Sequence, residues 1–296
     1  EPFHDPFLMM DMERAARRII QAIHAGEQIV VYGDYDVDGM TSTTLLMKNI
    51  RALGGMVSYY IPNRFTEGYG LNGAALRQIA ADGCGLLVTV DCGISSVDIV
   101  AQMDGAMDII ITDHHLPGSV LPPAYAVINP HRADCPYPDK DLAGVGVAFK
   151  LVQALWQIEE ERLYADDLDI AALGTVADLV PLVGENRKIV QLGLARMTEC
   201  PCLGIAALIR VSGCEGKAIN TGIVGFHLAP RLNAAGRIET ARRGVELLSA
   251  EDVHEADRIA AELNALNTER RDLEQDILTE AESMLGGFTP DVPAIV

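Results

Sequence analysis

The chain has 296 residues, 49% of them hydrophobic, and its formal net charge is −19 at pH 7. This length and composition exclude a disordered chain and allow one large domain or two ordinary ones. The acidic balance argues against a protein that binds nucleic acid over its whole surface, but it permits a local basic groove. No apolar run reaches the ~18–20 residues of a membrane span, so we expect a cytoplasmic protein.

The first predicted strand, residues 28–33, leads into three alternate aspartates, Asp34, Asp36 and Asp38, followed by Gly39. The pattern resembles a calcium loop, which needs a glutamate at its twelfth position, but that position holds Leu45. A calcium-binding EF-hand also lies between two helices, whereas the run before Asp34 is rich in β-branched residues. An acidic turn facing water and a metal site at a strand end remain as the alternatives.

Strand-like and helix-like runs alternate through the first ~180 residues, which predicts a parallel sheet with helices on both faces. The strand-like runs are 28–33, 56–62, 85–91, 107–113 and 125–130, and the helix-like runs between them are 41–53, 71–81 and 95–103. The fold class that we expect is therefore α/β.

From about residue 143 the pattern is mostly helical, with runs at 143–160, 168–180 and 239–249. Residues 250–285 lack Gly and Pro and have apolar residues at helical spacing, which predicts one long helix with Ser249 as N-cap and Gly286 as its stop. We expect a catalytic domain over 1–248, a connecting helix over 249–285, and at 286–296 the start of a further C-terminal domain that the chain does not hold in full.

Three predicted strands end in metal-ligating residues: the aspartate cluster after residue 33, Asp91, and Asp113 with His114 and His115. Parallel strands deliver their carboxyl ends to one edge of the sheet, so these groups should be neighbours in space. So many like charges repel unless a cation offsets them. Carboxylates suit magnesium and manganese, while imidazole favours later transition metals, so the mixed set points to manganese before magnesium. This number of ligands favours two ions, which suit hydrolysis at phosphorus.

Two further features fit this chemistry. Gly39 allows a tight turn into a helix whose first amides and hydroxyls, at Thr41, Ser42 and Thr43, could receive a phosphate. Asp178 lies in an apolar stretch, where a metal would compensate its burial; an aspartate facing water at a helix end is the alternative.

Segment 226–243 gathers arginines in an otherwise acidic chain, namely Arg231, Arg237, Arg242 and Arg243. Arginine matches phosphate geometry, and the small residues at 234–236 would let a nucleic-acid backbone come close. Ordinary surface arginines are the alternative.

The motifs GDYDVDG, VTVDCGIS, TDHHLPG and GTVADLVPL, in this order, resemble those of the DHH phosphoesterase superfamily, named for the triplet at 113–115. Within it, PNRFTEGYGL, LAGVGVAFKL and APRLNAAGR resemble the RecJ family of bacterial single-strand-specific exonucleases. Cys92 is a small departure, since many relatives carry asparagine there.

The resemblance implies a site of defined residues. It implies two Mn²⁺ or Mg²⁺ ions held by Asp34, Asp36, Asp38, Asp91, His114 and Asp178, with Asp91 as the bridge. His115 would then contact the scissile phosphate, while Arg231, Asn233 and Arg237 would bind the DNA backbone.

The resemblance also implies an activity: 5′-to-3′ hydrolysis of single-stranded DNA in repair and recombination. A helicase and a single-strand-binding protein are candidate partners, and no membrane is involved. Two alternatives remain, a phosphodiesterase of the same superfamily acting on short oligoribonucleotides or cyclic dinucleotides, and an inactive scaffold. The filled ligand positions argue against the scaffold, and the arginine segment favours a polymeric substrate.

Overall fold

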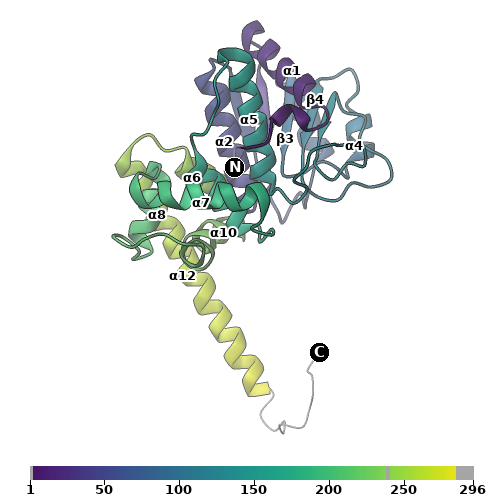
Figure 1. The fold of residues 1–296 in the computed structure, drawn as a ribbon. Helices are drawn as coiled ribbons and strands as arrows, with labels where there is room; N and C mark the ends of the chain where they lie inside the picture. The colour runs from purple at the N-terminus through teal and green to yellow at the C-terminus, as the bar shows by residue number, and fades with distance from the viewer. Residues whose placement is uncertain (1–2, 238–240, 285–296) are drawn as a thin grey trace.

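A five-stranded parallel sheet forms the centre of the protein, in the order β2-β1-β3-β4-β5 (Figure 1). The computed structural model describes residues 3–237 and 241–284. The strands are β1 Ile29–Tyr32, β2 Val57–Tyr60, β3 Leu86–Val90, β4 Asp108–Thr112 and β5 Ala126–Ile128. Each predicted strand is present and every pairing is parallel, so the α/β prediction is confirmed.

Helices cover both faces of the sheet because its strands are apolar on both sides. In β1, Ile29 and Val31 join the larger core cluster, while Val30 and Tyr32 join a second cluster on the opposite face. Alternate side chains of a strand point to opposite faces, so each strand is buried on both faces of the sheet. The larger cluster is covered by α1 Met12–Ala25, α2 Val37–Ala52 and α5 Gly144–Glu160, and the smaller one by α3 Gly73–Ala81 and α4 Val97–Ala101.

The remaining helices form a second layer that packs on α2 and α5. They are α6 Leu168–Ala177, α7 Gly184–Glu199, α8 Leu203–Val211, the short α9 Thr221–Ile223, the π-helical turn η2 Val224–Leu228, α10 Ala229–Arg237, α11 Ala241–Leu248 and α12 Val253–Met284, while a single turn η1 Pro6–Leu8 precedes α1. The sequence analysis did not anticipate α1 as a separate helix. No single described helix is long and apolar enough to cross a membrane; α7 and α8 reach that length and apolarity only as a pair bent by 74°.

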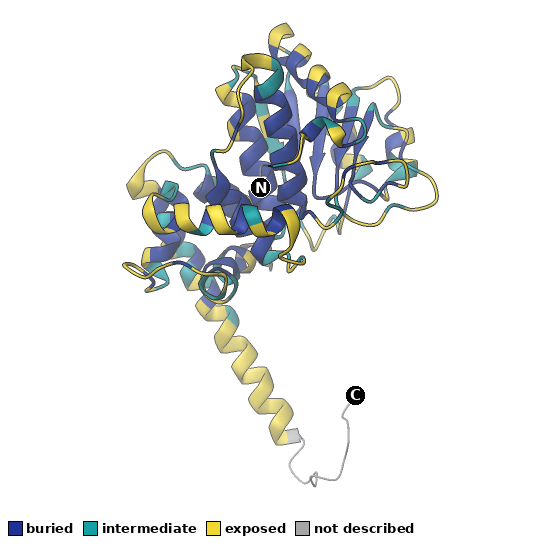
Figure 2. Ribbon diagram, viewed as in Figure 1, coloured by how far each residue is buried: buried dark blue, intermediate teal, exposed yellow. Residues whose placement is uncertain are grey.

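The long helix α12 has two different halves (Figure 2). Its first half is part of the core, because Ala256, Ile259, Ala260 and Leu263 are fully buried against the helical layer. Its distal half leaves the body of the protein and is exposed. The helix is thus anchored in the body of the protein over about its first three turns.

The start of α12 differs from the prediction. The helix begins at Val253, and the side chain of Asp252 accepts a hydrogen bond from the Glu255 amide at 2.9 Å. Ser249 was therefore the wrong N-cap, because an aspartate three residues later serves the first turn better. The predicted stop Gly286, and residues 286–296 as the start of a further domain, lie outside the described residues.

Candidate metal centre

The carboxyl ends of β1, β3 and β4 bring the predicted ligands together, as parallel topology requires. Three groups of side chains each place one ligand atom per residue within 4.8 Å of the others. These groups are Asp34, Asp36 and Asp91; Asp38, His114 and Asp178; and Asp91, His114 and His115. Six predicted ligands and His115 thus form one connected cluster, and Asp91 and His114 each belong to two of the groups.

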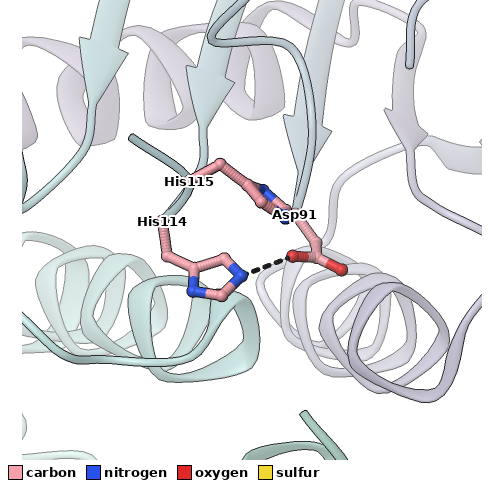
Figure 3. Close-up of side chains that lie close together, drawn as sticks. All are labelled: Asp91, His114 and His115. Carbon is pink, nitrogen blue, oxygen red and sulfur yellow. Dashed lines mark ion pairs between the residues drawn. The ribbon is translucent and has the colours of Figure 1, made fainter. Parts of the chain in front are cut away.

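Asp91 and His114 lie at the centre of this cluster (Figure 3). The Nε2 atom of His114 is 3.2 Å from Asp91 Oδ1, 3.9 Å from Asp38 Oδ2 and 3.7 Å from Asp178 Oδ2. None of these contacts has the geometry of a hydrogen bond. His114 Nε2, Asp91 Oδ1 and Asp34 Oδ1 are therefore all buried without a hydrogen-bond partner.

Three such orphan atoms in one cluster fit cation ligands. Buried polar atoms in folded proteins are nearly always hydrogen-bonded, and the exceptions need an explanation. Carboxylate oxygens and an imidazole nitrogen are donors that divalent metal ions accept. The residues present therefore fit a divalent-cation site, and the sharing of Asp91 between two groups fits two neighbouring ions.

Burial and mutual repulsion raise the pKa values of four carboxyls of the cluster, and burial lowers that of His114, so each shift favours the neutral form. Burial, with the charge of Asp36, raises the pKa of Asp34 and of Asp38 to about 7. Burial, with the charge of Asp38, raises the pKa of Asp178 to about 7 and that of Asp91 well above its ordinary value. Burial lowers the pKa of His114, which keeps its ring neutral as a ligand must be. The carboxylates are held close despite a large electrostatic cost that a cation would offset.

Local backbone geometry explains the positions of two aspartates. Gly39 is required in the aspartate turn because a Cβ there would lie 2.5 Å from the carbonyl oxygen of Asp34. Asp91 itself has a φ of 60°, a left-handed conformation that costs energy in a residue other than glycine. Such strain occurs often at functional sites.

Asp38 has a second task that the sequence analysis missed. Its two carboxylate oxygens accept hydrogen bonds from the first amides of α5, Gly144 N at 2.6 Å and Val145 N at 2.8 Å. No other side chain caps this helix, because its N-cap is Ala143. A glycine is needed at 144 because a Cβ would lie 2.5 Å from Asp91 Oδ1. The Gly-Val-Gly start of a helical run was the available signal in the sequence.

Asp113, the first residue of the DHH triplet, orients His115. Its Oδ1 accepts from the His114 and His115 amides and lies 2.7 Å from His115 Nδ1, while its Oδ2 accepts from Ile94 N at 2.9 Å. The bond to His115 lowers the pKa of Asp113 and raises that of His115. Because an ionised carboxylate only accepts, Nδ1 must carry the proton of this bond.

Tyr69 also lies beside His115, and the sequence analysis did not assign it to the site. The hydroxyl of Tyr69 lies 3.3 Å from His115 Nδ1, in a loop where Gly68 and Gly70 adopt positive φ.

Thr41 and Ser42 do not face the site. Both are fully buried, and the Thr41 hydroxyl donates to the carbonyl oxygens of Val37 and Asp38 within its own helix. The first turn of α2 is capped instead by Asp36, which accepts from Gly39 N at 2.9 Å. The prediction that these two hydroxyls bind phosphate is wrong, because both side chains are fully buried; Thr41 lies against α6, where a Cβ on Gly174 would be 2.2 Å from its Oγ1.

The arginine segment is only partly at the site. Asn233 is exposed and lines a cavity of about 420 Å³ beside the cluster. Arg231 does not line it, since its guanidinium donates to Asn264 Oδ1 and to the carbonyl oxygen of His227. The side chain of Arg237 lies outside the described residues. We call this space the active-site cavity; its lining includes Asp36, Asp38 and Asp178 of the cluster together with Phe226, Asn233 and Arg270.

Comparison with known proteins places this geometry in a family context. Residues 28–175 match the family model described as the DHH family, N-terminal domain. The chain is 48% identical to the single-stranded-DNA-specific exonuclease RecJ of Bacillus subtilis, over 99% of the chain and 37% of that protein. It is 42% identical to RecJ of Escherichia coli, over 91% of the chain and 49% of that protein.

The match extends to solved structures. A crystal structure of exonuclease RecJ bound to manganese superposes with a TM-score of 0.87 at 34% identity, covering 99% of this chain and 74% of that one. The structure of RecJ from Thermus thermophilus in complex with Mn²⁺ gives 0.83 at 33% identity, covering 95% and 41%. The chain spans about half, or less, of the length of the curated RecJ proteins that it matches.

Proposed function

The chain belongs to the DHH family, in its RecJ branch, and we propose that it is the catalytic core of an exonuclease that hydrolyses single-stranded DNA from the 5′ end with two Mn²⁺ or Mg²⁺ ions. One observation carries the proposal: Asp91 and His114 present buried ligand atoms without a hydrogen-bond partner where three groups of possible metal ligands meet. An inactive scaffold would have no reason to hold these charges together.

The ligand groups support a division of the site. Asp34, Asp36 and Asp91 would hold one ion, and Asp38, His114 and Asp178 would hold the other, with Asp91 between them. When bound, such a pair supplies an activated water and neutralises charge on the attacking and leaving oxygens at phosphorus.

The other site residues act on the substrate. His115 is half-exposed and its Nδ1 proton is committed to Asp113, so Nε2, which lies 3.5 Å from the Tyr69 hydroxyl, is the nitrogen that would donate a hydrogen bond to a non-bridging phosphate oxygen. The raised pKa of His115 favours the protonated ring that this task needs. Asp113 thereby positions His115 without touching the substrate.

A metal-dependent digestion tests the proposal. End-labelled single-stranded DNA and a dinucleotide are incubated in parallel with the protein and Mn²⁺, with Asp91→Ala as the control. Stepwise release of mononucleotides from the 5′ end, absent in the variant, is the expected result. Turnover of the dinucleotide alone would move the protein to the small-substrate phosphodiesterases, and no metal-dependent turnover of either would refute the proposal.

The wider biological role rests on the same resemblance. We propose that the protein acts in the cytoplasm, in DNA repair and recombination, and that a helicase and a single-strand-binding protein supply its substrate. The arginines Arg231 and Arg237 remain proposed contacts of the DNA backbone. Co-purification of either partner with the protein, dependent on a single-stranded substrate, would be the direct check.

A further inference from the structure

The active-site cavity contains one basic side chain among its described lining residues, and that side chain does not come from the arginine segment. It is Arg270 of α12, at the point where the helix leaves the body of the protein. Its side chain is 24% exposed, whereas residues 271–283, which follow it on the helix, are all exposed. The helix expected only to connect domains therefore contributes a cation to the proposed site.

The hydrogen bonds of Arg270 do not use all of its donors. Nη1 donates to Glu274 Oε1 and Nη2 to Asn267 Oδ1, but the buried Nε has no partner. A guanidinium has five N–H donors, and leaving one buried and unpaired costs free energy. The side chain thus has unused capacity to bind an acceptor.

An ordinary helix-surface ion pair does not account for this arrangement. Glu274 is 57% exposed, and exposed pairs four residues apart on a helix contribute little stability. The neighbouring Arg271 lies on the solvent face of the same helix and is exposed, unlike Arg270. The pair with Glu274 fixes one end of the Arg270 guanidinium, but it does not explain why the side chain lies in the cavity.

The same cavity is lined by the carboxylates Asp36, Asp38 and Asp178. In the described part of the chain, Arg270 forms its ion pair with Glu274 and with none of these three. A guanidinium and a cluster of proposed metal ligands that line one cavity without pairing to each other fit an anion that contacts both. The planar fork of arginine matches the oxygens of a phosphodiester.

We propose, resting on the function proposed above, that Arg270 is a substrate-binding residue that contacts a backbone phosphate of single-stranded DNA inside the active-site cavity. The apolar side chains of Leu179 and Phe226, 87% and 83% exposed at the rim, leave sugar and base a surface to lie against. On this assignment, the first part of α12 belongs to the substrate site as well as to the link between domains.

Three variants on α12 separate this role from its alternatives. Arg270→Gln removes the guanidinium. Arg271→Gln removes one positive charge from the adjacent, solvent-facing position and serves as the matched control. Glu274→Gln breaks the helix ion pair but keeps the guanidinium in place. Affinity for a fluorescent single-stranded oligonucleotide is measured by anisotropy in EDTA over a range of salt, and kcat and KM are measured with Mn²⁺.

Arg270→Gln should weaken binding about tenfold or more, because a charged hydrogen bond to phosphate is lost. It should also reduce the slope of log K against log salt by about 0.7, the value for one phosphate contact on a single strand. Arg271→Gln and Glu274→Gln should keep the slope of the unmodified protein.

Other outcomes decide clearly. If the unmodified protein degrades single strands and Arg270→Gln binds them with unchanged affinity and unchanged salt slope, this inference alone is overturned. An equal loss of affinity in Arg271→Gln would show that only the overall charge of α12 matters and would overturn the inference. An equal loss of affinity in Glu274→Gln would show that the ion pair within the helix, and not a phosphate contact of Arg270, is responsible. If the unmodified protein neither binds nor degrades single-stranded DNA, the proposed function itself fails.

Discussion

Adding a single methyl group at Gly144 should disable the metal centre while leaving the fold intact. Gly144 is the first residue of α5, and its amide donates to Asp38 Oδ2 at 2.6 Å. An alanine Cβ at this position would lie 2.5 Å from Asp91 Oδ1 and 2.8 Å from both Cβ and Cγ of Asp91, where real contacts essentially never fall below 3.0 Å.

The clash has no easy relief. Asp91 is 2% exposed, and the clash includes its Cβ, which cannot move without a shift of the backbone. Overpacking of this kind costs roughly 1–3 kcal/mol, part of which is returned because alanine forms helix better than glycine by about 1 kcal/mol. Stability should therefore change little. A displaced reacting group is more serious, since a shift of ~1 Å can cost about 100-fold in rate.

The assay compares Gly144→Ala with Gly146→Ala in the same helix. At 146 the new Cβ would first meet Leu142 Cδ2 at 3.2 Å, the end of a side chain that is not among the proposed metal ligands. We expect Gly144→Ala to lose at least tenfold in kcat or in Mn²⁺ affinity, with a melting temperature within a few degrees of the unmodified protein. Full activity in Gly144→Ala, or the same loss in Gly146→Ala, would refute the geometry on which this reasoning rests.

Two further predictions follow from the buried charges. Asp113→Asn should lower kcat by about 10- to 100-fold at unchanged Mn²⁺ affinity, because the amide holds His115 less firmly; an unchanged kcat would show that Asp113 does not position the ring. In EDTA, the melting temperature should fall as the pH rises from 5 to 7.5. The pKa of Asp34 and of Asp38 is raised from 3.8 to about 7, so the protonated carboxyls stabilise the metal-free fold at low pH, and that stabilisation is lost as the pH approaches 7. Saturating Mn²⁺ should restore stability at pH 7.5 by mass action, and a metal-free protein equally stable at both pH values would contradict the prediction.

The ligand set could be found from the sequence because it depends on topology alone. An alternation of apolar strands and helices specifies a parallel sheet, and a parallel sheet brings strand ends to one edge. Asp34, Asp91 and His114 each lie one or two residues after the end of a strand, so their proximity required no knowledge of packing. Asp178, at the end of α6, was found because a carboxylate in an apolar run needs a partner.

What only the tertiary structure decided is how the helices lie over that edge. Thr41 and Ser42 occupy the first turns of α2 as expected, but both are fully buried, Thr41 against α6, and no local pattern reveals which face of a helix another helix will bury. The amides of Gly144 and Val145 reach Asp38, 106 and 107 positions away in the chain, through the packing of α5 on α2. Arg270 reaches the active-site cavity because the first half of α12 is anchored in the core. Local composition sets the type and order of the elements, whereas contacts between residues far apart in the chain depend on side-chain packing that the periodicity of each segment does not encode.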